Sequence, residues 1–202
     1  MAVSKTSLCN HALTLCGAAP ITNITDDTNN ARVLNRVYEV TRKSILTECR
    51  WTFATSRATL SLSAVTMPWE HDGEAYVYVR PSHALRIFET SDRNAIWREE
   101  GDYIISNTAS LGIKFVYDHD DPSKYPSSFA EAFIDKLAAN ICYMILNSAS
   151  KAEGFITKYE GVSLPKAMAE SAQTGEQLDP PDDGILSVKL HDGGGRSDRS
   201  YG

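Results

Sequence analysis

The sequence has few cysteines, and none of them lies in a zinc-binding pair. Its four cysteines are Cys9, Cys16, Cys49 and Cys142, and no two of them form a Cys-x-x-Cys motif. Each lies in an apolar stretch with helical spacing, where a free cysteine behaves as a small hydrophobic residue. We therefore predict buried, unpaired thiols and a reducing compartment, which excludes a small fold held together by disulfides.

Long hydrophobic runs are also missing. An uncharged and mostly apolar stretch covers residues 137–150, and this is too short for a helix that spans a bilayer. The first five residues end in Lys5 and contain no apolar signal core. We therefore expect no membrane partner, and we expect the protein to be made in a cytoplasm.

A surplus of basic charge is absent. The chain has 26 acidic and 20 basic residues, a net charge of -6 and a pI of about 5.4. A general nucleic-acid binder needs a basic surface that displaces counterions from phosphates. The charge argues against a protein that grips DNA. It is compatible with a protein that surrounds DNA, because an acidic channel repels DNA and lets it slide.

Known catalytic and cofactor motifs are absent as well. The sequence contains no nucleophile elbow, phosphate-binding loop, dinucleotide fingerprint or zinc motif. We therefore expect no cofactor and no enzymatic activity. Residues 118–121, Asp-His-Asp-Asp, could offer oxygen ligands to a cation, but they lack the spacing of a calcium loop. A solvated connector is the favoured interpretation of this cluster.

One pair of acids keeps an enzymatic alternative open. Glu99 and Glu100 stand beside a predicted hairpin turn, and a glycan hydrolase uses two carboxylates as acid and base. Adjacent residues in a strand point to opposite faces, however, so this pair is poorly placed to act on one bond.

The periodicity of apolar residues changes twice along the chain. Helical spacing predicts helices up to about Cys16, from about Asn30 to Cys49, after Pro126, and from about Ala149 to Gln177. Pro165 is expected to kink or restart the last of them. Alternating, turn-separated runs between them predict a small antiparallel sheet. The predicted class is α+β. We expect a four-helix domain from residues 1–54 and 124–177, an inserted β-rich domain at 55–123, and an extended tail at 178–202.

The helix that follows Pro126 is apolar on nearly all sides. Phe129, Phe133, Leu137 and Ile141 form one stripe, and a second stripe through Ile134 runs beside it. A helix of this kind is either central in a bundle or shared with a neighbouring subunit.

Two groups of apolar residues are candidate interface sites. Trp51 and Phe53 end the second predicted helix, where they form either a plug between the helical and β parts or an anchor for a partner. The tail contains a single alternating run that either completes a partner's sheet or belongs to a disordered terminus. The apolar residues of this run are Ile185, Leu186, Val188 and Leu190.

Short patterned segments follow one another in the first sixty residues, at 8–17, 20–24, Ala31, 38–46, 51–54 and 57–60. Their order resembles the tail tubular protein A family, the head-to-tail adaptors of short-tailed, T7-like bacteriophages. The resemblance begins with the helix that contains Cys9 and Cys16 and ends at the alternating segment after Phe53. The later layout of β insertion, two helices and extended tail also agrees.

The resemblance implies a structural role in a virion. Such adaptors form a homo-oligomeric ring, a 12-mer, that joins the portal protein to the tail nozzle protein. Genomic DNA passes through the ring during ejection without specific binding, and the C-terminal tail reaches toward the portal. Two alternatives remain: a glycan hydrolase of the tail, and a head-completion protein with a similar helical core.

Overall fold

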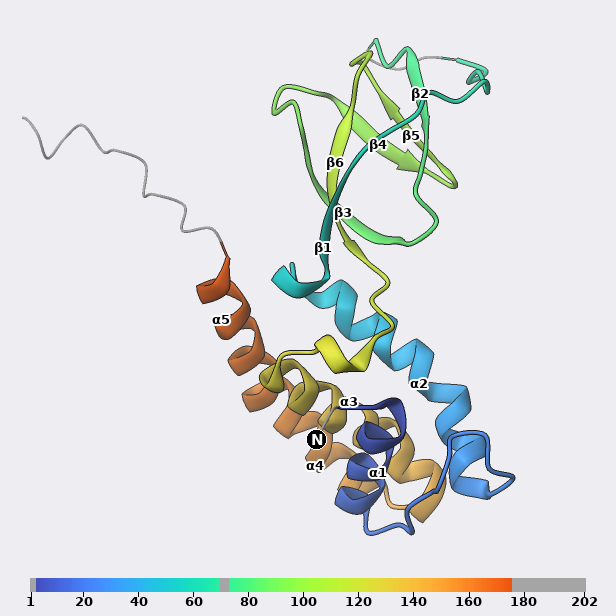
Figure 1. Cartoon of the computed structure of the whole chain (residues 1–202), viewed down its shortest axis with the longest axis vertical. Helices are drawn as coiled ribbons and strands as arrows, with labels where there is room; N and C mark the ends of the chain where they lie inside the picture. Colours follow the sequence, from blue (N-terminus) through green and yellow to red (C-terminus); the bar gives the residue numbers. More distant parts are fainter. Residues whose placement is uncertain (1–2, 70–72, 176–202) are drawn as a thin grey trace, which may run out of the picture.

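The computed structural model describes residues 3–69 and 73–175, which fold into a helical part and a β part at opposite ends of an elongated molecule (Figure 1). Helices flank the strands in the sequence, and the strands are antiparallel. The predicted α+β class is therefore confirmed. None of the described helices combines the length and the apolar composition needed to cross a membrane.

Capping hydroxyl residues begin the first two helices, and a glycine ends the first of them. Helix α1 covers Lys5–Cys16, and the Ser4 hydroxyl accepts a hydrogen bond from the Ser7 amide at 3.1 Å. Gly17 ends it with a φ of 79°, a conformation that glycine adopts without strain. Helix α2 covers Asn29–Glu48 and is capped by Thr28.

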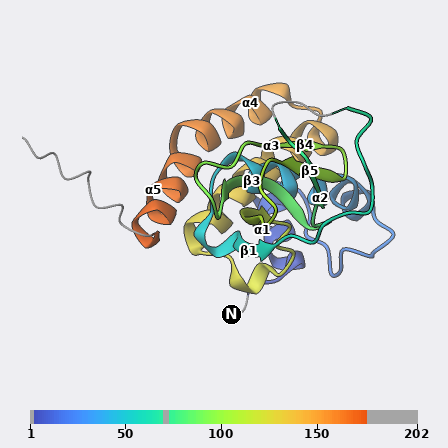
Figure 2. The same cartoon turned by 90° about the horizontal axis from the view of Figure 1, so that it is seen from above.

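The helices after the β part form two rods. Helix α3 covers Ser127–Leu146, and α4, Ala149–Lys158, continues through a π-helical segment, η3, Tyr159–Ser163, into α5, Leu164–Thr174. Pro165 has no amide to give to the carbonyl of Gly161, four residues earlier. The wider π-helical turn lies where that hydrogen bond is lost, so the chain stays helical through the predicted kink. In the view from above, α5 projects to one side of the strands (Figure 2).

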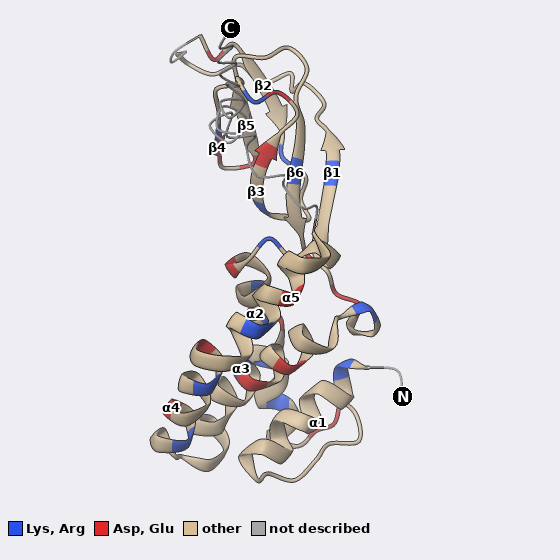
Figure 3. Ribbon diagram, turned by 90° about the vertical axis from the view of Figure 1, so that its left-hand side faces the viewer, with Lys and Arg blue, Asp and Glu red and all other residues tan. Residues whose placement is uncertain are grey.

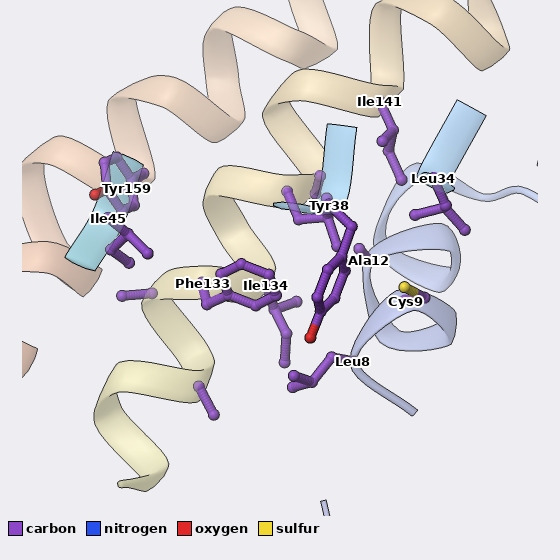
Figure 4. Close-up of a cluster of buried hydrophobic side chains, with 14 of the residues drawn as sticks. Leu8, Cys9, Ala12, Leu34, Tyr38, Ile45, Phe133, Ile134, Ile141 and Tyr159 are labelled. Carbon is purple, nitrogen blue, oxygen red and sulfur yellow. The ribbon is translucent and has the colours of Figure 1, made fainter. Parts of the chain in front are cut away.

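Helix α3 is the centre of the helical part and contacts α1, α2, α4 and α5. Figure 4 shows Tyr38 of α2 lying between α1 and α3, and its ring meets Phe133 edge-on at 5.1 Å. The apolar character of α3 is thus explained by burial over most of its length. Its last turns differ, because Tyr143 and Met144 are each 56% exposed.

The β part contains two small sheets, so the prediction of a single sheet is wrong. Their strand orders are β1-β6-β3 and β2-β5-β4. The chain passes between them after β1, since Leu62 bridges to Tyr78 of the second sheet. The buried faces share one core that includes Tyr78, Ile104 and Phe115. The strands are β1 Thr55–Thr59, β2 Tyr76–Val79, β3 Ala84–Thr90, β4 Trp97–Glu100, β5 Tyr103–Ser106 and β6 Gly112–Tyr117.

The predicted hairpin turn between Trp97 and Tyr103 is confirmed. Strands β4 and β5 pair in antiparallel register, with Glu100 opposite Tyr103. Gly101 lies in the turn with a φ of 58°, which a residue with a side chain adopts only under strain.

Candidate functional site: the aromatic junction

Two chain segments cross between the helical and β parts, and aromatic side chains fill the crossing. Trp51 lies between α2 and the short 3₁₀ turn η1, Thr52–Ala54. Only 1% of its surface is exposed, its indole Nε1 donates to the Ile45 carbonyl at 2.8 Å, and it meets Phe129 edge-on at 4.9 Å. Trp51 therefore closes the end of α2 against the start of α3.

Phe53 packs on the other side of the same cluster. Its ring centroid lies 4.7 Å from that of Phe129, 5.8 Å from Tyr125 and 5.7 Å from His119. Both aromatic residues therefore act as packing between the two parts, as the plug interpretation requires. Phe53 is half-buried, whereas Trp51 has almost no surface to offer a partner directly.

A mainly apolar cavity of about 390 Å³ adjoins these aromatic residues. Trp51, Phe53, Pro126 and Phe129 line it, together with Ala167 of α5. The Thr52 amide donates to the hydroxyl of Ser171 at 3.1 Å, which ties η1 to α5 at its rim. The interface role of Trp51 and Phe53 stays a prediction, and this cavity is the surface that both residues line. Ile185, Leu186, Val188 and Leu190 lie outside the described residues.

The acidic cluster at residues 118–121 is a connector between β6 and the helices, as we predicted, but it is only partly solvated, because Asp120 is exposed and His119 is buried. Asp118 binds the Arg42 guanidinium at 2.9 Å and the Lys43 ammonium at 3.4 Å, so it fixes the end of β6 to α2. The Asp121 carboxylate instead accepts from the Ser123 amide at 3.0 Å and caps the turn η2, Pro122–Lys124. Across residues 3–69 and 73–175, no three His, Cys, Asp or Glu residues are arranged to hold a metal ion.

Arg42 is the residue of this junction that the sequence analysis missed. It is only 4% exposed and also pairs with Glu39 at 2.6 Å. The signal was present in the spacing, because Arg42 follows Tyr38 by four residues and precedes Ile45 by three. A buried arginine on such a stripe needs an acid from another element, and Asp118 supplies it.

His119 is buried among aromatic rings. It stacks on Tyr117 with ring centroids 5.1 Å apart and an angle of 21° between the rings, and its Nδ1 accepts from the Asp121 amide at 3.3 Å. Burial lowers the pKa of His119 below its ordinary value of 6.5. The folded protein therefore favours the neutral form of His119.

A pH titration of stability should reveal this histidine. Below a pH of about 6.5, the unfolded chain binds a proton at His119 that the folded chain does not bind, because the pKa of His119 is lower in the folded state. The free energy of unfolding therefore falls as the pH is lowered through this range. Between about pH 8 and about pH 5, wild type should lose more stability than H119Q, measured by urea unfolding at each pH. H11Q, at an exposed histidine of α1, is the control and should follow wild type. Parallel curves for wild type and H119Q would contradict the assignment.

Glu99 and Glu100 are engaged by different arginines. Glu99 binds Arg80 at 2.7 Å, whereas Glu100 binds Arg98 at 2.8 Å. Arg98 and Glu100 are two apart in β4 and share one face of the strand, and Glu99 points to the other. The two carboxylates therefore do not meet as an acid–base pair, and the hydrolase alternative stays a prediction.

The buried thiols follow the packing interpretation. Cys9, Cys16 and Cys142 are buried, Cys49 is half-buried, and all four are free. Burial raises the pKa of Cys9 and of Cys16 to about 12, which keeps them protonated and unreactive.

Comparison with known proteins adds no assignment: no protein-family model matches the chain, and no curated protein matches it significantly.

Proposed function

We propose that this protein is a structural component of a bacteriophage particle, a head-to-tail adaptor. In this proposal, copies of the chain form a ring that joins the portal to the tail nozzle, and genomic DNA passes through without specific binding. The family resemblance of the first sixty residues supports it, as does the acidic net charge of -6. The ring size of twelve is taken from the resemblance.

Exposed apolar side chains on the helical part are the observation that carries the proposal. Val40 of α2 is 69% exposed, and Tyr143 and Met144 of α3 are 56% exposed. The Asn140 amide of α3 donates to the Thr41 hydroxyl of α2 at 2.8 Å, which brings these two stretches of helix together. Large apolar side chains that are exposed on neighbouring stretches of helix are typical of a protein–protein interface. We assign this surface, Val40, Tyr143 and Met144, to contacts between neighbouring copies.

The place of the helices, the β part and the tail in the molecule suggests a role for each of them. The helices of residues 1–54 and 124–177 would form the wall of the ring. The β part at residues 55–123 stands away from them (Figure 1) and would face the nozzle. The tail at residues 178–202 would reach the portal. Lys, Arg, Asp and Glu are interspersed over the helical part (Figure 3), which suits a wall that does not grip DNA.

Assembly on a portal tests the proposal. Purified protein mixed with its portal protein should give a complex whose mass corresponds to a ring, visible by negative-stain microscopy on the portal face. V40E and M144E should each reduce this assembly by about tenfold or more, because they bury a charge in the interface. V79E is the matched control, since Val79 is an exposed valine of the β part, away from the wall. It should assemble like wild type.

Two outcomes would overturn the proposal. The first is a portal face that carries no ring. The second is an equal loss of assembly in V79E, which would show that any added charge disrupts the complex. A head-completion protein with a similar helical core would bind another part of the particle, so a ring on a different partner would favour that alternative.

A further inference from the structure

The outer face of the sheet β1-β6-β3 carries a hollow of about 490 Å³. Its floor lies at Gly112, where the missing side chain leaves the face open between Thr59 of β1 and Ser91 after β3. The Gly112 amide donates to the Ser91 hydroxyl at 2.9 Å, and a Cβ at Gly112 would stand 3.1 Å from that of Ser91. The hollow is therefore fixed by the backbone.

Basic side chains line this hollow. Arg57 and Lys114 are directly opposite each other in the antiparallel pair of β1 and β6, so they share one face. Figure 3 shows the basic bands of β1 and β6 at the same level. Lys114 has an acidic partner on its other side, Glu89 of β3, at 3.5 Å. Like charges directly opposite each other are unfavourable, and Arg57 has no acid beside it to offset this.

Arg57 and Arg93, which both line the hollow, are exposed and have no ionic, hydrogen-bonding or ring partner within the described part of the chain. Most other described arginines have one. Arg80 and Arg98 bind carboxylates, for example, and Arg86 donates to a carbonyl. Two free guanidinium groups and several hydroxyls therefore converge on one concave surface. A guanidinium fork is the group that proteins use to bind carboxylates and phosphates in pairs of hydrogen bonds.

We propose that this hollow binds an acidic peptide segment of a partner protein, with its carboxylates held by Arg57 and Arg93. A ligand carboxylate beside Arg57 would give each of the two adjacent cations an acid on its outer side, the ligand for Arg57 and Glu89 for Lys114. A nucleic acid is disfavoured, because Glu89 stands in the hollow and the chain as a whole is acidic. The site does not depend on ring formation, so it stands or falls separately from the adaptor proposal.

Binding of a model acidic peptide tests the site. The probe is a neutral-dye-labelled peptide of alternating Asp and Ser, titrated with the full chain at low salt and followed by fluorescence anisotropy. The double variant R57Q/R93Q should bind it about tenfold or more weakly than wild type. R36Q is the matched control, because Arg36 is also exposed and without a partner in the described residues, but lies on α2. It should bind within about twofold of wild type.

Three results would overturn the proposal. One is a loss of affinity in R36Q as large, per charge removed, as that in R57Q/R93Q, which would show that only net charge matters. Another is tighter binding of a single-stranded oligodeoxynucleotide or of inorganic phosphate than of the peptide, lost in the double variant. The third is wild-type affinity in the double variant. Thermal unfolding gives an independent check: R57Q alone should be as stable as wild type or slightly more stable, since it removes an unrelieved like-charge pair.

Discussion

Replacing Trp51 with alanine is expected to lower the free energy of unfolding by about 4 kcal/mol. The indole is 1% exposed and packs against Phe129 at 4.9 Å, so its removal leaves a cavity where α2, η1 and α3 meet. The Ile45 carbonyl also loses the Nε1 donor. Urea unfolding followed by circular dichroism measures the effect, because the helical signal does not depend on the tryptophan itself.

Phe53 supplies the comparison for this experiment. It belongs to the same cluster but is half-buried, so F53A should cost about half as much as W51A. W51F keeps most of the packing and should recover much of the loss. If W51A costs no more than about 1 kcal/mol, water already reaches the indole in the folded protein, and the junction is not the closed plug that the distances indicate.

The helices could be predicted from the sequence because their signals are local. Ser4 and Gly17 bound α1 as capping and stop signals do, and the hairpin at Gly101 follows from a single turn residue. The π-helical segment was not predictable in this form. A proline predicts a lost hydrogen bond. Whether the helix then breaks or forms a wider π-helical turn depends on the contacts between α3 and the turn before Pro165.

Tertiary features were predicted less well, for a physical reason. Alternation fixes which face of a strand is buried, but it does not say which strand lies alongside, so two sheets were taken for one. The row of Arg57, Lys114 and Glu89 depends on the register of three strands far apart in sequence. Of the candidate site residues, Trp51 and Phe53 were singled out because they lie at a change of periodicity, and the structure places them in the packing of the junction, whereas their interface role stays a prediction. His119 was assigned to solvent.

The second large effect is expected at the ion pair that holds the π-helical segment. The Asp135 carboxylate of α3 is 1% exposed, and it accepts from the Lys158 ammonium at 2.8 Å and from the Ser163 hydroxyl. Lys158 directly precedes η3 and Ser163 ends it, so one buried acid binds both ends of the segment. K158A leaves that acid without its counterion and should lower the free energy of unfolding by about 3 kcal/mol.

A double-mutant cycle separates this pair from its surroundings. If the cost of K158A comes from an unpaired buried carboxylate, D135N removes the charge, and K158A in that background should cost much less than alone. A coupling of about 1–3 kcal/mol is expected by urea unfolding. K166A is the matched control, because Lys166 pairs with Glu131 at 2.7 Å between the same helical rods, but both side chains are about half exposed.

The control variant K166A decides how the cost of K158A is interpreted. An exposed pair is worth less than about 1 kcal/mol, since water already stabilises both charges, so K166A should be nearly silent. Alanine is also the better helix former, so lost propensity cannot explain a large cost in K158A. If K158A and K166A had equal effects, water would reach Asp135 in the folded protein. The π-helical segment would then be held by its packing against α3, and not by the buried acid.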